Sequence, residues 1–387
     1  MNLPLPTDEP TPAEGAAAPP GTRSSTERGP PAAFAIFRKD GGSLVRSAAE
    51  ASQLHSKGYY GSFEDHGTLH LDRRETLYLV EVGRLEVRES EDGPPLALPD
   101  LVHRIHCVEP GFEVPYLVYR DLRQRGYVVR AGTGDHEFAV LPRGGTFPTT
   151  PAQYWVWAIS ERQEFSLGKL TAFLDRAQGA RKKVLLGVVD EESDLTYYLL
   201  RGVTPRGRHP APSNPPPAEG VLLDDRVAIF DPAAVEWLGK RELYGSLVGG
   251  RLDLSLVEAT HLVGSGQLTV ADGRTLRRIS RKAFLEHART IERELDLLLQ
   301  SYGDLRRAGL VPKTGFKYGT HFRAYEGDPQ QTHARYLVHT VPVEYRSSWP
   351  EVSRAIRLAH GVKKSFLFSW SDGTETQHYV SLQRIRP

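Results

Sequence analysis

The feature that most constrains the fold of this chain is an internal repeat, because four segments recur in the same order in two parts of the sequence. The aligned segments are YYGSFEDHGTLHLDRRETLYLV (59–80) with LYGSLVGGRLDLSLVEATHLV (243–263), YRDLRQRGYVV (119–129) with YGDLRRAGLVP (302–312), QYWVW (153–157) with RYLVH (335–339), and GARKKVLLGVV (179–189) with GVKKSFLFSW (361–370). Self-similarity of this kind is typical of a structural unit present twice. We therefore predict a tandem duplication, each copy holding a small N-terminal subdomain and a larger α/β domain.

Two segments interrupt this pattern. Residues 1–32 are rich in Pro, Ala, Gly, Ser and Thr and carry few large apolar side chains, so they cannot bury enough surface to offset their ordering entropy. We expect a disordered tail there, and a Pro-rich linker at 204–219. The remaining predicted boundaries are 33–108 and 109–203 for the subdomain and α/β domain of copy one, and 220–283 and 284–387 for those of copy two.

Hydrophobic spacing predicts the elements of the α/β domain. Apolar residues at helical spacing indicate a helix over 115–125 that stops at Gly126, and a second helix over 166–178 with Ser166 as its N-cap. Short apolar runs predict strands at 127–129, 138–141, 154–159, 183–189 and 195–200. This order of helices and strands predicts an α/β fold with mixed-sheet units, repeated from about residue 284.

Three residues of the second copy could together cleave RNA. Tyr325, His333 and Lys364 fall on neighbouring predicted strands and at a helix end. The 2′-hydroxyl of RNA is an internal nucleophile, so a cleaving site need only deprotonate it, protonate the 5′-oxygen and stabilise the charge on phosphorus. A histidine titrates near pH 6.5 and suits the acid, a tyrosine titrates near pH 10 and needs adjacent positive charge to act as a base, and a lysine supplies that charge.

The surrounding residues carry a family resemblance. The runs GFKYGTHFRAYEG, THARYLVH and RLAHGVKK resemble the catalytic C-terminal domain of the archaeal tRNA-splicing endonucleases, or tRNA-intron lyases. The resemblance implies that Tyr325 is the base, His333 the acid and Lys364 the transition-state stabiliser, with no metal or other cofactor. Lys363 stands where the family usually has an arginine, and we expect Lys364 to reach the phosphate. The implied substrate is precursor tRNA with bulge-helix-bulge intron junctions, cut to 2′,3′-cyclic phosphate and 5′-hydroxyl ends.

The first copy lacks two of these groups. Leu141 stands where the second copy has Tyr325, and Pro151 stands where it has His333, while Lys182 matches Lys364. Leucine and proline side chains cannot move protons. Copy one is therefore predicted to be structural.

One complete site per chain, together with the two cuts that intron removal needs, predicts a homodimer. In the family that this chain resembles, an acidic loop of the inactive copy docks onto the other subunit. The residues that fit this loop lie in VVDEESDLTYY: Asp190, Glu191, Glu192 and Asp194. A solvated turn would have the same composition.

The same resemblance implies how RNA is held. An arginine on a helix and a nearby aromatic ring grip an unpaired base, and these correspond to Arg357 and Trp349. Arg384 or Arg386, near the C-terminus, is expected to contact a backbone phosphate.

Composition limits the other possibilities. A net charge of +1 means that any RNA-binding surface is a local patch. Cys107 is the one cysteine, and no apolar run approaches the roughly 18 residues of a membrane span, so we expect a cytoplasmic protein without membrane contact. The HRIHC run at 103–107 has no second cluster to complete a zinc site.

Two rival functions are weighed against RNA cleavage. The first is a non-catalytic architectural subunit of a heteromeric splicing endonuclease, which would bind tRNA and need an active partner. The second is a metal-dependent DNA nuclease, which would need clustered carboxylates on the strands, and no such cluster is evident in the sequence.

Overall fold

The computed structural model describes residues 33–134, 136–210, 217–371, 373 and 376–387. The chain divides into two compact units, Met1–Pro110 and Gly111–Pro387. The predicted tail at 1–32 and residues 211–216 of the predicted linker lie outside the described residues. No helix in the described part of the chain is both long and apolar enough to cross a membrane.

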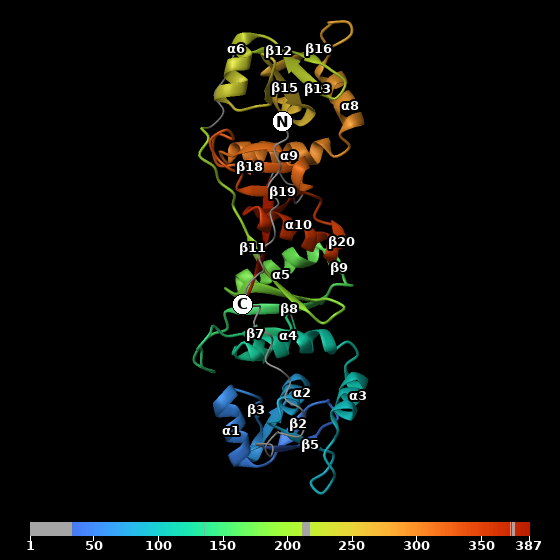
Figure 1. Ribbon diagram of the computed structural model, residues 1–387, viewed down its shortest axis with the longest axis vertical. Coiled ribbons are helices and arrows are strands. Elements are labelled where there is room, and N and C mark those ends of the chain that lie inside the picture. Colours follow the sequence, from blue (N-terminus) through green and yellow to red (C-terminus); the bar gives the residue numbers. More distant parts are fainter. Residues whose placement is uncertain (1–32, 135, 211–216, 372, 374–375) are drawn as a thin grey trace, which may run out of the picture. The chain divides into compact units, whose positions relative to one another are not determined.

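Unit 1 contains the first N-terminal subdomain, a five-stranded sheet with the strand order β3-β4-β2-β1-β5 (Figure 1). Its elements are β1 (Phe34–Phe37), β2 (Ser43–Val45), α1 (Ala48–Gly58), β3 (Ser62–Phe63), η1 (Asp65–Gly67), β4 (Leu69–Leu71), α2 (Arg73–Glu81), β5 (Glu86–Arg88) and α3 (Leu98–Val108).

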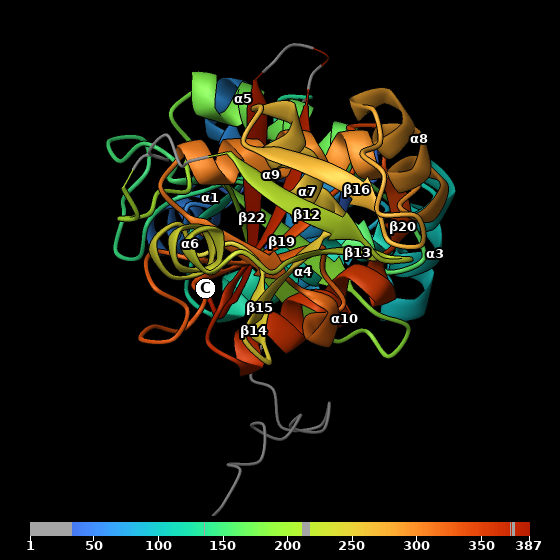
Figure 2. The same cartoon turned by 90° about the horizontal axis from the view of Figure 1, so that it is seen from above.

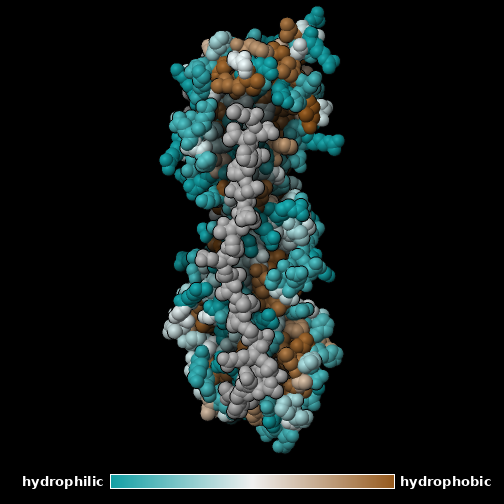
Figure 3. All heavy atoms as spheres, viewed as in Figure 1, coloured by the Kyte–Doolittle hydropathy of each residue, from teal (hydrophilic) through white to brown (hydrophobic). Residues whose placement is uncertain are grey.

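The second half of unit 2 begins with the second N-terminal subdomain. Its five-stranded sheet has the corresponding strand order, β14-β15-β13-β12-β16 (Figure 2). Its elements are β12 (Ala218–Leu222), β13 (Arg226–Ile229), α6 (Pro232–Ala234), the π-helical η2 (Val235–Arg241), β14 (Ser246–Val248), β15 (Arg251–Ser255), α7 (Leu256–Gly264), β16 (Leu268–Asp272) and α8 (Arg281–Ile291). Hydrophobic residues are visible on its surface in Figure 3, and the exposed large ones are Phe230, Leu247, Val248, Leu276 and Ile291.

One buried carboxylate sets the same local geometry in both subdomains. Glu75 completes the capping box of α2 and also accepts the Gly61 amide proton at 2.9 Å. Glu258 completes the capping box of α7 and accepts the Gly245 amide proton at 2.8 Å. Both glycines have positive φ, which a side chain would strain. These matched contacts confirm the duplication predicted from the sequence.

The two larger domains share one ten-stranded sheet with the order β17-β18-β19-β21-β22-β11-β10-β8-β7-β6. Copy one contributes α4 (Glu113–Gln124), β6 (Val129–Ala131), β7 (Phe138–Val140), β8 (Tyr154–Ser160), β9 (Glu164–Ser166), α5 (Leu167–Gly179), β10 (Lys183–Val189) and β11 (Leu195–Gly202). Copy two contributes α9 (Leu295–Arg307), β17 (Val311–Thr314), η3 (Phe316–Tyr318), β18 (Phe322–Tyr325), β19 (Tyr336–Thr340), β20 (Arg346–Ser348), α10 (Trp349–Gly361), β21 (Ser365–Ser371) and β22 (Gln377–Ile385).

The two copies meet about a pseudo-twofold axis. Antiparallel pairing of β11 with β22 places Leu200 opposite Leu382, its counterpart in the repeat. A second pair of strands, β9 and β20, lie side by side (Figure 1) and place Phe165 opposite its counterpart Ser347. Buried residues from α5 and α10 then form a single hydrophobic cluster. The joined edges make one folded body from two repeats.

Local patterns predicted most of these elements well. Ser166 is the N-cap of α5 and accepts a hydrogen bond from the Lys169 amide, as its type and position suggested. The strand expected at 127–129 was placed too early, because β6 is Val129–Ala131. Tyr127 instead closes the turn after α4, where its amide bonds to the Leu122 carbonyl.

Candidate functional site

Backbone hydrogen bonds bring three strand ends together in copy two. The Arg335 amide donates to the Ala324 carbonyl at 3.0 Å, and the Ser365 amide donates to the Arg335 carbonyl at 3.0 Å. The end of β18 therefore lies beside the starts of β19 and β21. Tyr325 and Lys364, which adjoin these bonded residues, are two strands apart, or roughly 10 Å at the usual strand spacing.

Tyr325 and His333 reach this end of the sheet from different surroundings. Tyr325 is the last residue of β18 and is 7% exposed, packed in a small cluster with Val311 and Ala334. His333 is exposed in the loop before β19, two residues ahead of Arg335. Among the described residues, neither the Tyr325 hydroxyl nor the His333 ring has a hydrogen-bond partner.

The turn that ends α10 aims Lys364 at the sheet. The Lys364 amide bonds to the Ala359 carbonyl and the Lys363 amide bonds to the His360 carbonyl, which is a Schellman arrangement. Lys363 takes the left-handed position with φ of 54° and is exposed. The half-buried Lys364 side chain has its Nζ 3.3 Å from the Val362 carbonyl and 5.6 Å from the Tyr318 ring centroid.

Copy one repeats this backbone but not the side chains. The Gln153 amide bonds to the Val140 carbonyl, and the Lys183 amide to the Gln153 carbonyl, in the same pattern. At the two positions that match Tyr325 and His333, it has Leu141 and Pro151. The remaining lysine of this copy, Lys182, extends its Nζ to 2.8 Å from the carbonyl of Ala152, next to that proline. A lysine at the position of Lys364 can thus reach the residue beside His333.

Trp349, which the sequence predicted to hold an RNA base, is almost fully buried in this structure. The indole is 2% exposed, with its ring centroid 5.2 Å from that of Phe165 and 6.2 Å from that of Tyr198. Both partners belong to copy one, so a contact made across the repeat interface covers the ring. In this position little of the indole is exposed to a nucleotide base, although Trp349 lines the same cavity as Arg357.

Arg357 lies elsewhere on the same helix and is exposed. With Arg354 it lines a cavity of about 430 Å³, whose opposite wall includes Glu161 and Asp190 of copy one. The structure thus places a residue predicted to bind RNA and one predicted to mediate docking on the same cavity.

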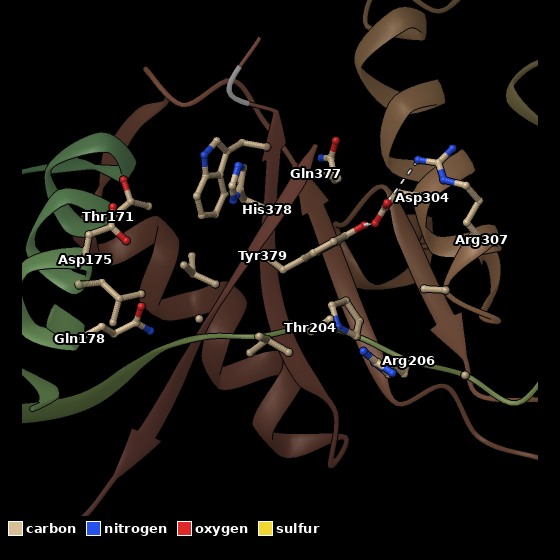
Figure 4. Close-up of a pocket in the computed structure, with 18 residues that line it drawn as sticks. Thr171, Asp175, Gln178, Thr204, Arg206, Asp304, Arg307, Gln377, His378 and Tyr379 are labelled. Atoms are coloured by element: carbon tan, nitrogen blue, oxygen red, sulfur yellow. Dashed lines mark hydrogen bonds and ion pairs between the residues drawn. The ribbon is translucent and has the colours of Figure 1, made fainter. Parts of the chain in front are cut away.

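The pseudo-twofold axis relates this cavity to another of about 850 Å³. In Figure 4, Thr171, Asp175 and Gln178 of α5 face Gln377, His378 and Tyr379 of β22, and Asp304 bonds to both Tyr379 and Arg307. Asp175 stands at the repeat position of Arg357. Of these two cavities, the smaller one is lined by two arginines of α10, Arg354 and Arg357, whereas α5 contributes no arginine to the larger one.

The acidic residues predicted to dock form a hairpin turn between β10 and β11. Asp190, Glu191, Glu192 and Asp194 are all exposed. The Asp190 carboxylate holds the turn by accepting the amide protons of Glu192 and Asp194. Glu191 pairs with Arg162 at 3.2 Å, and both of these side chains are well exposed. The turn presents its negative charge outward.

Arg384 lies at the end of β22, which runs antiparallel to β21. This end of β22 is beside the start of β21, where Lys364 is found. Arg384 is exposed. Its guanidinium and the Lys364 ammonium therefore belong to the same end of the sheet.

His321 and His339 of the second copy are poorly suited to proton transfer near neutral pH. His321 and His339 stack with ring centroids 4.7 Å apart. Burial lowers the pKa of both rings, to about 4 for His339, whose pKa the neighbouring His321 lowers further.

His103 Nε2 lies 3.7 Å from Cys107 Sγ, but no group of three or more metal-ligating side chains occurs among the described residues.

Sequence reasoning did not single out Arg323, which precedes Tyr325 by two residues on β18. Its guanidinium carbon lies 5.7 Å from the centroid of the Tyr325 ring. A signal was present in the repeat, because copy one has Ala139 at this register position.

Two family models match the chain twice each. The tRNA intron endonuclease N-terminal domain matches residues 39–101 and 218–285, and the tRNA intron endonuclease catalytic C-terminal domain matches residues 112–197 and 295–379. A tRNA-splicing endonuclease of Methanococcoides burtonii is 36% identical over 342 residues, covering 87% of this chain and 95% of that protein. One of Methanosarcina mazei is 36% identical over 350 residues, covering 89% and 97%. One of Halobacterium salinarum is 35% identical over 298 residues, covering 72% and 81%.

Proposed function

The chain belongs to the tRNA intron endonuclease family and is an endonuclease of that family, and we propose that it removes introns from precursor tRNA by cutting both splice sites of a bulge-helix-bulge motif. The reaction is a transesterification at phosphorus that uses protein side chains. It leaves a 2′,3′-cyclic phosphate on one product and a 5′-hydroxyl on the other.

The observation that carries this proposal is the alignment of Tyr325, the His333 loop and Lys364 at one end of three bonded strands. Tyr325 takes the proton of the 2′-hydroxyl, whose oxygen then attacks phosphorus. His333 gives a proton to the 5′-oxygen as its bond to phosphorus breaks. Lys364 stabilises the negative charge that develops on the non-bridging oxygens. The equivalent reach of Lys182 to Ala152 supports Lys364 over the exposed Lys363 for this role.

Copy one serves as a structural partner in this proposal. Its Leu141 and Pro151 side chains carry no group that exchanges protons. Its strand β11 pairs with β22 and so covers the edge of the copy-two part of the sheet. Each chain therefore makes one cut at a time.

We assign RNA contacts to Arg357 and Arg384. Both guanidinium groups are exposed, and Arg384 is at the Lys364 end of the sheet. Arg357 would stack on an unpaired base, as arginine does with splayed single-stranded nucleotides. Trp349 is left out of this assignment because the Phe165 ring covers it.

This function is tested by incubating the purified chain with an intron-containing precursor tRNA in the presence of a metal chelator and following cleavage. We expect excised intron and exon halves with cyclic phosphate and 5′-hydroxyl ends. A matched RNA with 2′-deoxynucleotides at the two cut sites should bind but stay intact, since it lacks the nucleophile. Binding without cleavage of the all-ribose RNA would instead assign the chain the role of an architectural subunit.

We propose that two chains assemble so that both splice sites are cut by one complex. The acidic turn Asp190–Asp194 supports this because it presents exposed carboxylates that a basic surface on the second chain can recognise. Sedimentation should give twice the 43.1 kDa mass of the chain. Replacing Asp190, Glu191, Glu192 and Asp194 with serine should shift the assembly toward the monomer, whereas replacing the exposed Asp224 and Asp225 should not. A dimer that survives the first set of changes would remove the turn from the interface.

A further inference from the structure

Arg323 shares a face of the sheet with Tyr325. Side chains alternate between faces along a strand, and the two neighbours of Arg323, Phe322 and Ala324, pack in the core against α9. Arg323 is paired in register with Leu337, which packs in the cluster formed with α10. Arg323 and Tyr325 therefore share one face of β18, consistent with the 5.7 Å between the guanidinium and the phenol ring. Arg323 also lines a cavity of about 590 Å³ together with Lys313 and Glu258.

The charge of Arg323 has no carboxylate partner among the described residues. Its side chain is half-buried, and the buried Nε makes no hydrogen bond there. By contrast, Arg335 in the adjacent loop pairs with Glu326 at 2.8 Å. A partly buried guanidinium that lacks its anion is costly unless a ligand supplies one.

The nearest strand adds to this positive charge. Lys313 of β17 is paired in register with Arg323. Burial lowers the pKa of Lys313, Glu258 opposes that shift, and the charges of Arg306 and Arg323 lower the pKa further. The Lys313 ammonium already has Glu258 at 3.5 Å and the Gly245 carbonyl at 2.7 Å. The unmatched cation beside Tyr325 is thus Arg323.

The repeat provides an internal comparison. At the same register position of β7, copy one has Ala139, opposite Trp155 as Arg323 is opposite Leu337. The copy that lacks the tyrosine and the histidine therefore also lacks the arginine, although it keeps the lysine at Lys182. The guanidinium occurs in the copy that carries the proton-transfer groups.

We propose that Arg323 is a further catalytic residue, whose guanidinium binds a non-bridging oxygen of the scissile phosphate while the Lys364 ammonium binds the other side. This assignment rests on the proposed function. The planar guanidinium fork suits a phosphate geometrically, which a single ammonium does not. Arg323 neither gives nor takes a proton. It stabilises the charge that builds on phosphorus after Tyr325 has removed the 2′-proton.

The test compares Arg323→Ala and Arg323→Lys with the unaltered chain in single-turnover cleavage of precursor tRNA at saturating protein. Alanine is compatible with the strand, since Ala139 occupies this position in β7. We expect Arg323→Ala to cut about 10²–10³-fold more slowly and to bind the 2′-deoxy RNA with little change in Kd. Lysine should restore part of the rate. Arg346→Ala, which removes an exposed arginine paired with Glu164, is the matched control and should cut normally.

A phosphorothioate substrate separates contact with the phosphate from a structural effect. The unaltered chain should discriminate between the two sulfur diastereomers at the cut site, and Arg323→Ala should lose part of that discrimination. A variant that cuts at the normal rate, or whose defect disappears at higher protein concentration, would overturn the catalytic role of Arg323 and leave the proposed function intact. If the unaltered chain itself fails to cut, the proposed function is what fails.

Discussion

Replacing His333 with alanine is expected to slow cleavage of precursor tRNA by about 10²–10⁴-fold, the usual contribution of a general acid or base. The loss arises because the 5′-oxygen would leave as an alkoxide without a proton donor. The fold should be unaffected, since the imidazole is exposed and makes no hydrogen bond with the described residues. Binding of the uncleavable 2′-deoxy RNA should therefore be retained.

The leaving group tests the assigned role. When sulfur replaces the 5′-bridging oxygen of the substrate, the leaving group departs as a thiolate and needs little protonation. His333→Ala should therefore cut this substrate at close to the normal rate. His360→Ala, which removes an exposed histidine of α10, is the matched control and should behave like the unaltered chain on both substrates. Equal slowing of His333→Ala on the oxygen and sulfur substrates would mean that the imidazole does not donate the proton.

Replacing Phe165 with alanine is expected to lower the free energy of unfolding by about 3–5 kcal/mol, the range for large aromatic truncations in cores. Phe165 is fully buried. Its ring centroid lies 5.2 Å from that of Trp349 and 5.3 Å from that of Phe368. One aromatic side chain from copy one thus fills the core of copy two, and its removal leaves a cavity between them.

Urea unfolding followed by tryptophan fluorescence measures this effect, because Trp349 is a direct neighbour of the substituted ring. Phe316→Ala is the matched control, since that phenylalanine is 87% exposed and should cost little. A loss below about 1 kcal/mol for Phe165→Ala would indicate that the interface relaxes around the missing ring and that other contacts hold the copies together.

The sequence predicted the duplicated organisation because the repeated segments preserve turn and capping residues, such as Gly61 with Glu75, that lie only 14 residues apart in the chain. It predicted the cluster of Tyr325, His333 and Lys364 through the family resemblance. Whether these side chains act as assigned stays a prediction.

Long-range contacts were less accessible to sequence reasoning. The burial of Trp349 depends on Phe165 of the other copy, and no local pattern around either residue encodes their contact. Arg323 was overlooked because its strand shows an ordinary alternation of apolar and polar residues. Its isolation from carboxylates becomes evident only when the neighbouring strands are in place.

The pairing of β11 with β22 shows what copy one contributes to the sheet of copy two. A solitary second half would end its sheet at Gln377–Ile385, a nine-residue strand whose free amides and carbonyls would be an open template for any extended chain. The first half occupies that template permanently and with fixed register. The structural role proposed for copy one is compatible with this arrangement, since sealing the border of the copy-two sheet uses the backbone of β11.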